Sequence, residues 1–251
     1  MSVLRVAAHV HSTWSYDGEW QLDDLARAFA RRGYQAVLMS EHDRTFDDER
    51  WEQFGAACSA ASAGGALLVP GIEYSDAENL VHVPVWGSPA FLGKDRPTAE
   101  LLRDARRADA VAVLAHPNRK DAWRSFEPDW LELAGGVEIW NRKVDGWAPG
   151  SAGLEVAATA GAGLWPFVGL DFHSARQFFP LAMTTAWDGR TPTVGAVLDA
   201  LRAGAFAATA FGRPAAQFLH GRGLEMVRAG ERVRRPLAKA YRRGRGLAAR
   251  G

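Results

Sequence analysis

The feature that most limits the fold of this chain is an alternation between two kinds of segment. Apolar, β-branched runs alternate with alanine- and leucine-rich stretches of helical period, starting with a strand at residues 3–8 and a helix at 21–32 that Gly33 ends. Repeated strand-then-helix order predicts a mainly parallel sheet, and the number of units indicates closure into a barrel. A chain of 251 residues can form one such domain.

The expected strands cover residues 3–8, 35–40, 66–73, 80–85, 110–115, 136–140, 164–170, 181–187 and 205–210. The expected helices cover residues 21–32, 47–63, 98–108, 152–162 and 193–203. No internal repeat or linker divides this series. We therefore expect a single α/β barrel domain over residues 1–210.

Charge is distributed unevenly along the chain. The net charge is +1, yet residues 211–251 contain eleven basic and two acidic residues, so the preceding segment is acidic. We expect residues 211–251 to be a basic C-terminal extension, partly helical or disordered. Such an extension could bind weakly to an anionic partner, namely nucleic acid, anionic lipid or an acidic protein face. A solvated tail without a partner is the simpler interpretation.

Cysteine content and hydropathy bear on the compartment. Cys58 is the only cysteine, so no intrachain disulfide can form, and its place in a helical run favours a small buried apolar role. No apolar stretch is long enough to span a bilayer, and the first residues enter a strand without a signal-peptide pattern. We expect a cytoplasmic protein without a transmembrane segment. The oligomeric state is not indicated.

Histidines concentrate at the ends of the expected strands. In an α/β barrel the loops after the strands form one functional face, so residues far apart in sequence meet there. Because alternate residues of a strand point the same way, two histidines one residue apart can offer both imidazoles to one ion. Six of the seven histidines have such positions: His9, His11, His42, His82, His116 and His173.

Carboxylates occupy matching positions. They are Asp17, Glu41, Glu73, Glu138 and Asp171. A buried carboxylate is costly unless a positive charge meets it, and divalent cations would supply that charge. Imidazole and carboxylate ligands without thiolates suit Zn, Mn or Fe. Each residue alone is more simply a hydrogen-bonded side chain or a helix cap, so the argument rests on their convergence. His220 lacks such neighbours and is interpreted as structural.

These motifs resemble the PHP (polymerase and histidinol phosphatase) superfamily of metal-dependent phosphoesterases. The similarity spans residues 3–210, and one motif departs, because the family more often has Thr-Asp-His where this chain has "EHD". The motifs are "HVHS" with Asp17, "EHD" at 41–43, "GIEYS" around Glu73, "VHVP" at His82, "AHPN" at His116 and "GLDFHS" at 169–174.

The resemblance implies a distorted (β/α)7 TIM-like barrel that holds two or three divalent ions at the strand ends. One ion would be held by His9, His11, Glu73 and Asp171. Glu73 would bridge to a second ion on His82 and His116, and Asp17, His42 and His173 would hold a third. Glu73 and Asp171 would thus serve catalysis. Glu138 lies near them and would either bind metal or orient a ligand.

The chemistry expected of this site is hydrolysis of a small phosphate monoester or diester by a metal-activated hydroxide. No P-loop or Gly-x-Ser-x-Gly elbow suggests another route. Loop arginines could bind the substrate phosphate, and the candidates are Arg119, Arg176, Arg44 and Arg142. Trp14, Trp86 and Trp140 flank the motifs and could stack on a base or sugar, although packing is the simpler role.

Three alternatives stay open. The first is a metal-dependent amidohydrolase, whose barrel also begins with His-x-His but commonly uses a carboxylated lysine, and no lysine ends a strand here. The second is a nuclease acting on nucleic-acid ends, which the acidic body disfavours because it would repel a phosphate backbone. The third is a vestigial metal-binding module whose basic tail binds nucleic acid or membrane.

Overall fold

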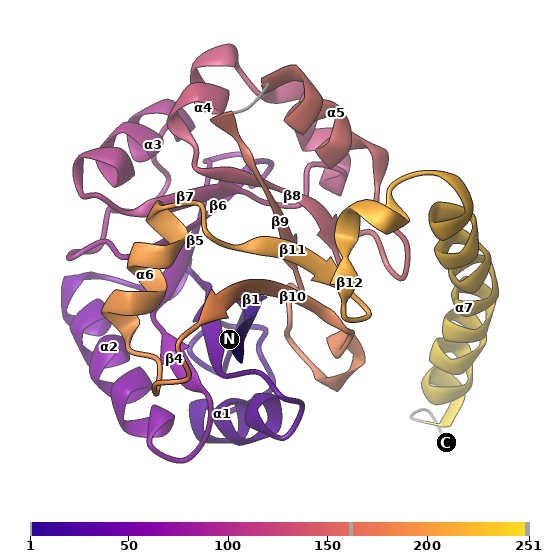
Figure 1. The fold of residues 1–251 in the computed structure, drawn as a ribbon, viewed down its shortest axis with the longest axis horizontal. Helices are drawn as coiled ribbons and strands as arrows, with labels where there is room; N and C mark the ends of the chain where they lie inside the picture. Colours follow the sequence, from indigo (N-terminus) through magenta and orange to yellow (C-terminus); the bar gives the residue numbers. More distant parts are fainter. Residues whose placement is uncertain (1, 161–162, 249–251) are drawn as a thin grey trace.

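A computed structural model describes residues 2–160 and 163–248 of the chain. The described chain is a mixed α/β fold with two six-stranded sheets, in the strand orders β12-β11-β10-β1-β2-β4 and β3-β5-β6-β7-β8-β9. In Figure 1 helices α1 to α5 lie around the strands, and α7 stands apart at one side beyond β12.

The strands are β1 (Ser2–Val10), β2 (Ala36–Met39), β3 (Glu41–His42), β4 (Leu67–Val69), β5 (Gly71–Ser75), β6 (His82–Trp86), β7 (Val111–Leu114), β8 (Gly136–Asn141), β9 (Trp165–Gly169), β10 (Leu181–Trp187), β11 (Ala207–Ala210) and β12 (Arg213–Pro214). The helices are α1 (Leu22–Ala30), α2 (Asp48–Ser62), α3 (Thr98–Arg107), α4 (Pro128–Leu133), α5 (Ser151–Ala160), α6 (Val194–Arg202) and α7 (Gly221–Ala248). The last two residues of the helix expected at 152–162 lie outside the described residues.

The two sheets are connected on both sides. On one side, β2 and β4 of the first sheet continue after single residues, Ser40 and Pro70, as β3 and β5 of the second. On the other side, the backbone beyond β9 bonds to β1: the Leu170 N–H donates to the Ala8 carbonyl at 2.9 Å, and the His11 N–H to the Phe172 carbonyl at 2.8 Å. The strand ends that carry the candidate ligands therefore lie next to one another.

The expectation of a mainly parallel sheet is wrong. β6 runs antiparallel to both β5 and β7, and β10 runs antiparallel to both β1 and β11. Between β5 and β6 the chain has only six residues, too few for a helical crossover. The Asp76 carboxylate accepts the N–H groups of Leu80 and Val81 at 2.7 and 3.1 Å, which closes a hairpin instead.

Aromatic rings form part of the core between the strands. Trp86 and Phe167 stack with centroids 6.1 Å apart, and the Trp86 indole donates to the Met39 carbonyl at 2.7 Å. Gly71 permits this packing, because a side chain at that position would overlap the Trp86 ring. Trp86 and Trp140 are buried, so the packing role for these two tryptophans is confirmed.

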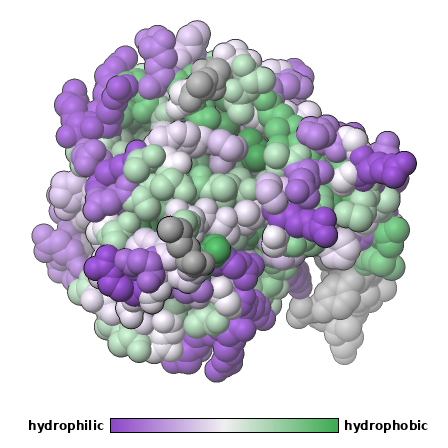
Figure 2. All heavy atoms as spheres, in the orientation of Figure 1, coloured by the Kyte–Doolittle hydropathy of each residue, from purple (hydrophilic) through white to green (hydrophobic). Residues whose placement is uncertain are grey.

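The basic C-terminal segment begins on the body of the fold. β12 pairs with β11, and the Phe218 ring, in a short 3-10 helix at Ala215–Phe218, packs 6.3 Å from Trp140 and 5.3 Å from Phe211. α7 then runs from Gly221, and Val227 on its inner face is buried. Figure 2 shows hydrophilic side chains on much of the visible face of the molecule. Within the described residues, no helix has the length and apolar character needed to cross a membrane.

Candidate metal centre

The six histidines expected at strand ends form one buried cluster. His11 is central in it, with its ring centroid 5.2 Å from that of His9, 4.4 Å from His42 and 4.1 Å from His173. His116 lies 5.6 Å from His9 and 4.9 Å from His82. All six side chains are buried.

His82 reaches the cluster because β6 is reversed. It is the first residue of its strand, and it pairs in register with Ser75, the last residue of β5. Antiparallel pairing therefore puts the beginning of β6 at the same edge as the ends of the parallel strands. The His82 Nε2 atom lies 2.7 Å from the Asn79 side-chain oxygen, which leaves Nδ1 directed at Glu73, 2.9 Å away.

The Glu73 carboxylate lies at the centre of the histidines. Its Oε1 atom is 3.1 Å from His9 Nε2 and 3.0 Å from His116 Nε2, in addition to His82. Its Oε2 atom is 3.0 Å from His42 Nδ1 and 3.7 Å from His11 Nε2. The two oxygens thus face different histidines, as a carboxylate between two cations would.

Aspartates complete the cluster on its open side. Asp171 Oδ1 is 3.6 Å from His11 Nε2 and 3.3 Å from His173 Nδ1. Asp17, which is partly exposed, lies 3.2 Å from His42 Nε2 and 3.1 Å from His173 Nε2. The structure therefore brings together all nine residues that the sequence nominated as ligands.

The donor atoms fit divalent ions. His9 Nε2 and His11 Nε2 are buried and make no hydrogen bond within the described residues, since the 3.1 Å contact of His9 Nε2 with Glu73 is a charge contact without hydrogen-bond geometry. Buried polar atoms are nearly always hydrogen-bonded. Four triads have ligand atoms within 4.8 Å of one another: His9–His11–Glu73, Glu73–His82–His116, His11–His42–His173 and His9–His116–Asp171. Imidazole nitrogens and carboxylate oxygens at this spacing suit Zn, Mn or Fe.

Glu138 contacts two of the candidate ligands, His9 and His116. One carboxylate oxygen lies 2.8 Å from His9 Nδ1, and the other accepts the His116 N–H and the Asn141 side-chain amide, each at 2.8 Å. Gly169 lies so close that a side chain there would overlap this carboxylate. Glu138 therefore orients His9, leaving His9 Nε2 directed at Glu73.

Glu41 has a similar supporting position behind His11 and His42. Its carboxylate accepts the Ser12 N–H at 2.9 Å and the hydroxyls of Ser12 and Ser15 at 2.6 and 2.5 Å. The Ser15 hydroxyl oxygen in turn accepts the His42 N–H at 2.9 Å and lies 3.4 Å from His11 Nδ1. The acid in "EHD" thus holds the loop that carries His11.

The charges in the cluster shift the pKa values of its members. Burial would raise the pKa of Asp171, but His9, Lys143 and His173 hold it well below its ordinary value. Burial opposes protonation of His9, yet Glu138 and the other carboxylates raise its pKa. Burial, together with His173 and His42, lowers the pKa of His11. Asp171 is consequently ionised and His11 neutral, which are the forms that bind metal, whereas the raised pKa of His9 favours the protonated form, which must lose its proton when metal binds.

Lys143 is a site residue that the sequence analysis missed. Its Nζ atom lies 3.3 Å from Asp171 Oδ1 and 3.1 Å from His173 Nε2, and 39% of its side chain is exposed. Lys143 lies two residues beyond β8 and follows Arg142 in "WNRK". Its position after a strand that carries Glu138 is the signal that could have identified it.

The four candidate arginines have different surroundings. Arg119 is half-buried and donates to the Asn79 carbonyl at 2.8 Å, beside the His82 loop. Arg142 is buried against the Phe179 ring and donates to the Arg176 carbonyl at 3.0 Å; burial and Arg234 lower its pKa to about 10. The side chains of Arg44 and Arg176 are exposed. Lys143 therefore contacts two candidate ligands directly, and Arg119 contacts Asn79, whose side chain lies against His82.

We compared the chain with known proteins by sequence and by fold. No protein-family model and no curated protein sequence matches the chain. Solved structures do match its fold, and they confirm, at the level of the fold, the resemblance to PHP-like metal-dependent phosphoesterases.

One match is a two-domain protein from Bacteroides vulgatus that contains a predicted PHP-like metal-dependent phosphoesterase. It has a TM-score of 0.62 and 19% identity, and the match covers 83% of this chain but 65% of that one. A second is PsfC from Pseudomonas syringae, with a TM-score of 0.58 and 14% identity over 79% of this chain and 88% of PsfC. A third is an amidohydrolase from Chromobacterium violaceum, with a TM-score of 0.50 and 14% identity over 78% and 96% of the two chains.

Proposed function

We propose that the protein is a metal-dependent hydrolase that cleaves a small phosphate monoester or diester. The observation that carries the proposal is the Glu73 carboxylate, which lies within 3.1 Å of four histidines, three in separate strands and one just beyond a fourth strand. One buried carboxylate needs one or two hydrogen-bond partners, not four imidazoles. A pair of divalent ions, by contrast, requires several imidazole ligands around a shared carboxylate. We place the site in a distorted (β/α)7 TIM-like barrel formed by the two connected sheets.

Nine residues would hold two or three ions, Mn, Zn or Fe. They are His9, His11, Asp17, His42, Glu73, His82, His116, Asp171 and His173. When bound, such ions lower the pKa of water toward ~7 and offset the charge that develops on a phosphoryl group. The residues of the chain determine where the ions would bind. One oxygen of Glu73 faces His9, His82 and His116, and the other faces His42. Glu138 orients the His9 ring.

Two cationic side chains would bind the substrate phosphate. Lys143 reaches the open side of the cluster from the loop after β8, and Arg119 lies beside His82. Both can donate to the non-bridging oxygens, over which the negative charge of the phosphoryl group is spread in the transition state. Arg176 and Arg44 stay further candidates. The buried position of Arg142 makes a role in packing better supported than phosphate binding.

A turnover assay with three variants tests the proposal. His11→Ala and Asp171→Ala should each abolish hydrolysis of p-nitrophenyl phosphate and bis-p-nitrophenyl phosphate in Mn or Zn, and release metal, while circular dichroism stays unchanged. His220→Ala is the matched control, because His220 is exposed and far along the chain from the cluster. Wild-type turnover in both ligand variants would refute the site.

An amidohydrolase is the second candidate, because the structure from Chromobacterium violaceum has a similar fold. A carboxylated lysine between two ions would support it. In this chain Glu73 has the central position, and Lys143 instead approaches Asp171 as an ammonium would, at 3.3 Å. Assaying the metal-loaded protein on N-acyl amino acids alongside the phosphate esters discriminates the two: we expect turnover of esters only.

The remaining expectations are proposals of the same kind. A nuclease would cleave single-stranded oligonucleotides from one end in the same assay. A vestigial module would bind metal and hydrolyse nothing. The cytoplasm stays the expected compartment, and a weak anionic partner for residues 211–251 stays a prediction that oligonucleotide and anionic-vesicle binding would test.

A further inference from the structure

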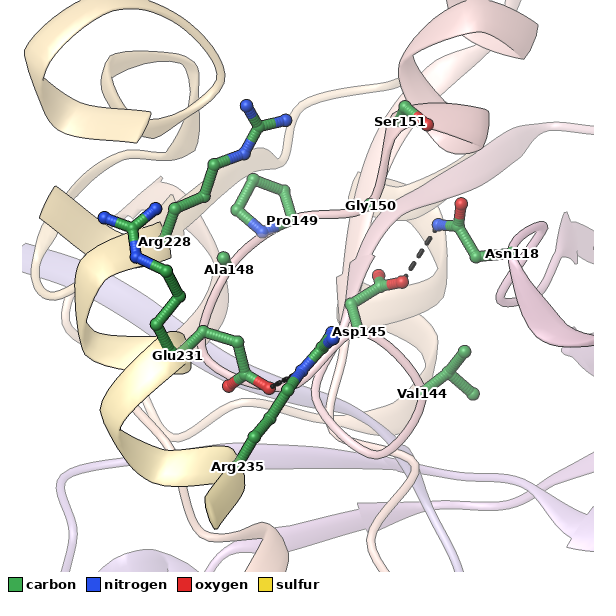
Figure 3. A pocket seen from close by; sticks show the side chains of 11 residues that line it. Asn118, Val144, Asp145, Ala148, Pro149, Gly150, Ser151, Arg228, Glu231 and Arg235 are labelled. Carbon is green, nitrogen blue, oxygen red and sulfur yellow. Dashed lines mark hydrogen bonds and ion pairs between the residues drawn. The ribbon is translucent and has the colours of Figure 1, made fainter. Parts of the chain in front are cut away.

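A second cavity lies between α7 and the body of the fold, outside the histidine cluster. Its volume is about 480 Å³, and it is bounded on one side by the loop after β8 and the start of α5, and on the other by α7. Figure 3 shows Asn118 and Asp145 on the side of the body, opposite Arg228, Glu231 and Arg235 of the helix.

The cavity is lined by three arginines, of which one has a counterion within the described residues. Arg228, Arg232 and Arg235 all face it from α7. Arg235 donates to the Glu231 carboxylate at 2.8 Å, and Arg234 donates to both oxygens of that carboxylate at 2.6 Å. Arg228 and Arg232, which are exposed, have no hydrogen bond or ion pair within the described residues. Two guanidinium groups are therefore available to an anion.

The acidic residue on the opposite wall is already paired. Asp145 accepts the Asn118 side-chain amide at 2.9 Å on one oxygen and the Asn141 N–H at 2.8 Å on the other. Both of its oxygens thus accept hydrogen bonds from the body, and burial raises the pKa of Asp145 to about 6. The Ser151 hydroxyl and the Asn118 amide add neutral polar groups to the wall.

Besides the buried Val227, Glu231 attaches α7 to the body beside the cavity. The Glu231 carboxylate accepts the Trp147 N–H at 2.8 Å, and Gly146 lies so close to it that a side chain would overlap the carboxylate. Gly146 has a φ of 86°, a conformation that glycine adopts without strain. The arginines of α7 are therefore positioned against the body by a specific contact.

We infer that this cavity binds the phosphoryl group of a small anion, at a site separate from the metal ligands. A volume of about 480 Å³ suits a small molecule rather than a polymer backbone. Guanidinium groups bind phosphate oxygens through paired, charge-assisted hydrogen bonds, and two of them without counterions are the chemistry such a group requires.

The cavity is also connected to the metal centre by hydrogen bonds. They run from Asn118 through Asp145 and Asn141 to Glu138, whose other oxygen contacts His9. An anion that moves α7 or the wall at Asn118 would therefore act on the residue that orients His9. The binding itself does not depend on the proposed hydrolysis and can be measured without metal.

Titration calorimetry with inorganic pyrophosphate, in EDTA, tests the inference. Wild-type protein should bind it, and Arg228→Gln/Arg232→Gln should bind about tenfold more weakly or worse. Arg213→Gln/Arg222→Gln is the matched control, because it removes the same charge from the same segment at a different cavity. Equal loss in the two double variants would show mere charge attraction and overturn the inference, as would absence of binding to the wild type.

The same titration on Lys143→Gln separates two sources of the phosphoryl group, because without metal Lys143 is the cationic side chain that faces Asp171 and His173. Unchanged pyrophosphate affinity there, with loss in Arg228→Gln/Arg232→Gln, supports a ligand independent of the substrate. Weaker binding in Lys143→Gln, with or without a loss in the double variant, would place the anion at the metal centre and contradict the inference.

Discussion

At the scale of single residues, three candidate ligands have unusual backbone conformations. His9, His116 and Asp171 have φ angles of 62°, 30° and 47°, in the left-handed region that residues other than glycine seldom occupy. Each such residue costs on the order of 1–3 kcal/mol and persists only where the surroundings impose it. All three occur at one buried cluster. The strained backbone therefore directs these side chains into the cluster at a cost in stability.

Glu138→Gln is expected to weaken metal binding about 10–100-fold without unfolding the protein, because Glu138 orients His9 and is not itself placed as a ligand. Competition with a chromophoric chelator measures the affinity. Glu155→Gln is the control, since Glu155 is an exposed residue of α5. An unchanged affinity in Glu138→Gln would mean that the His9 ring is held by its own packing.

Most candidate ligands could be predicted at this scale, whereas their supporting contacts could not. Histidine and carboxylate side chains at strand ends identify themselves by type and position, as His9, Glu73 and Asp171 do. The role of Glu138 depends on which of its oxygens faces His9, and the role of Lys143 on a loop conformation. Neither follows from spacing along the chain.

At the scale of elements, the reversal of β6 decides whether His82 can reach the cluster. A parallel β6 would have put His82 at the opposite edge from Glu73, because it is the first residue of its strand. The sequence contained the signal in the six-residue connection after β5, with Asp76 available to cap a turn. In the rest of the chain the alternation of strands and helices predicts a mainly parallel sheet, so the overall pattern and this local signal disagree.

The attachment of α7 is expected to depend on pH through Glu231. Burial alone would raise the pKa of Glu231, but hydrogen bonds from Arg234, the Trp147 N–H and Arg235 lower it to about 2. Because the unfolded value is about 4.3, the stabilisation is fully present above that pH and is lost as pH falls through about 2.

Glu231→Gln should therefore lower the free energy of unfolding by about 1–2 kcal/mol near neutral pH. The deficit relative to the wild type should shrink as pH falls from 5 to 3. Urea titrations at several pH values measure it, with Glu225→Gln, an exposed residue of the same helix, as the control. A deficit that does not change with pH would show that the charge of Glu231 is unimportant.

At the scale of the whole molecule, residues 213–248 form β12, a short 3-10 helix that packs on the body, and α7. The uneven charge identified this stretch, but the contacts of Phe218 with Trp140 and of Glu231 with Trp147 involve partners far away in sequence. Such contacts have no local signature. The division into a domain at 1–210 and an extension at 211–251 stays a prediction.

Two truncations test that division. A chain ending at Ala210 loses the Phe218 ring and should be destabilised by about 3–5 kcal/mol, with exposed apolar surface and poor solubility. A chain ending at His220 keeps Phe218 and should stay folded, with ester turnover retained. Thermal melts and turnover compare the two, and equal stability would show that 211–220 contributes nothing to the core.

The most direct test of the central claim is the metal content of the purified protein, measured by mass spectrometry after loading with Mn, Zn or Fe and removal of free ions. If the Glu73 cluster holds ions as proposed, the wild type should retain two or three per chain, and Glu73→Gln should lose most of them while staying folded. A wild-type protein that retains none of the three metals, or a Glu73→Gln variant that retains the full complement, would contradict the account.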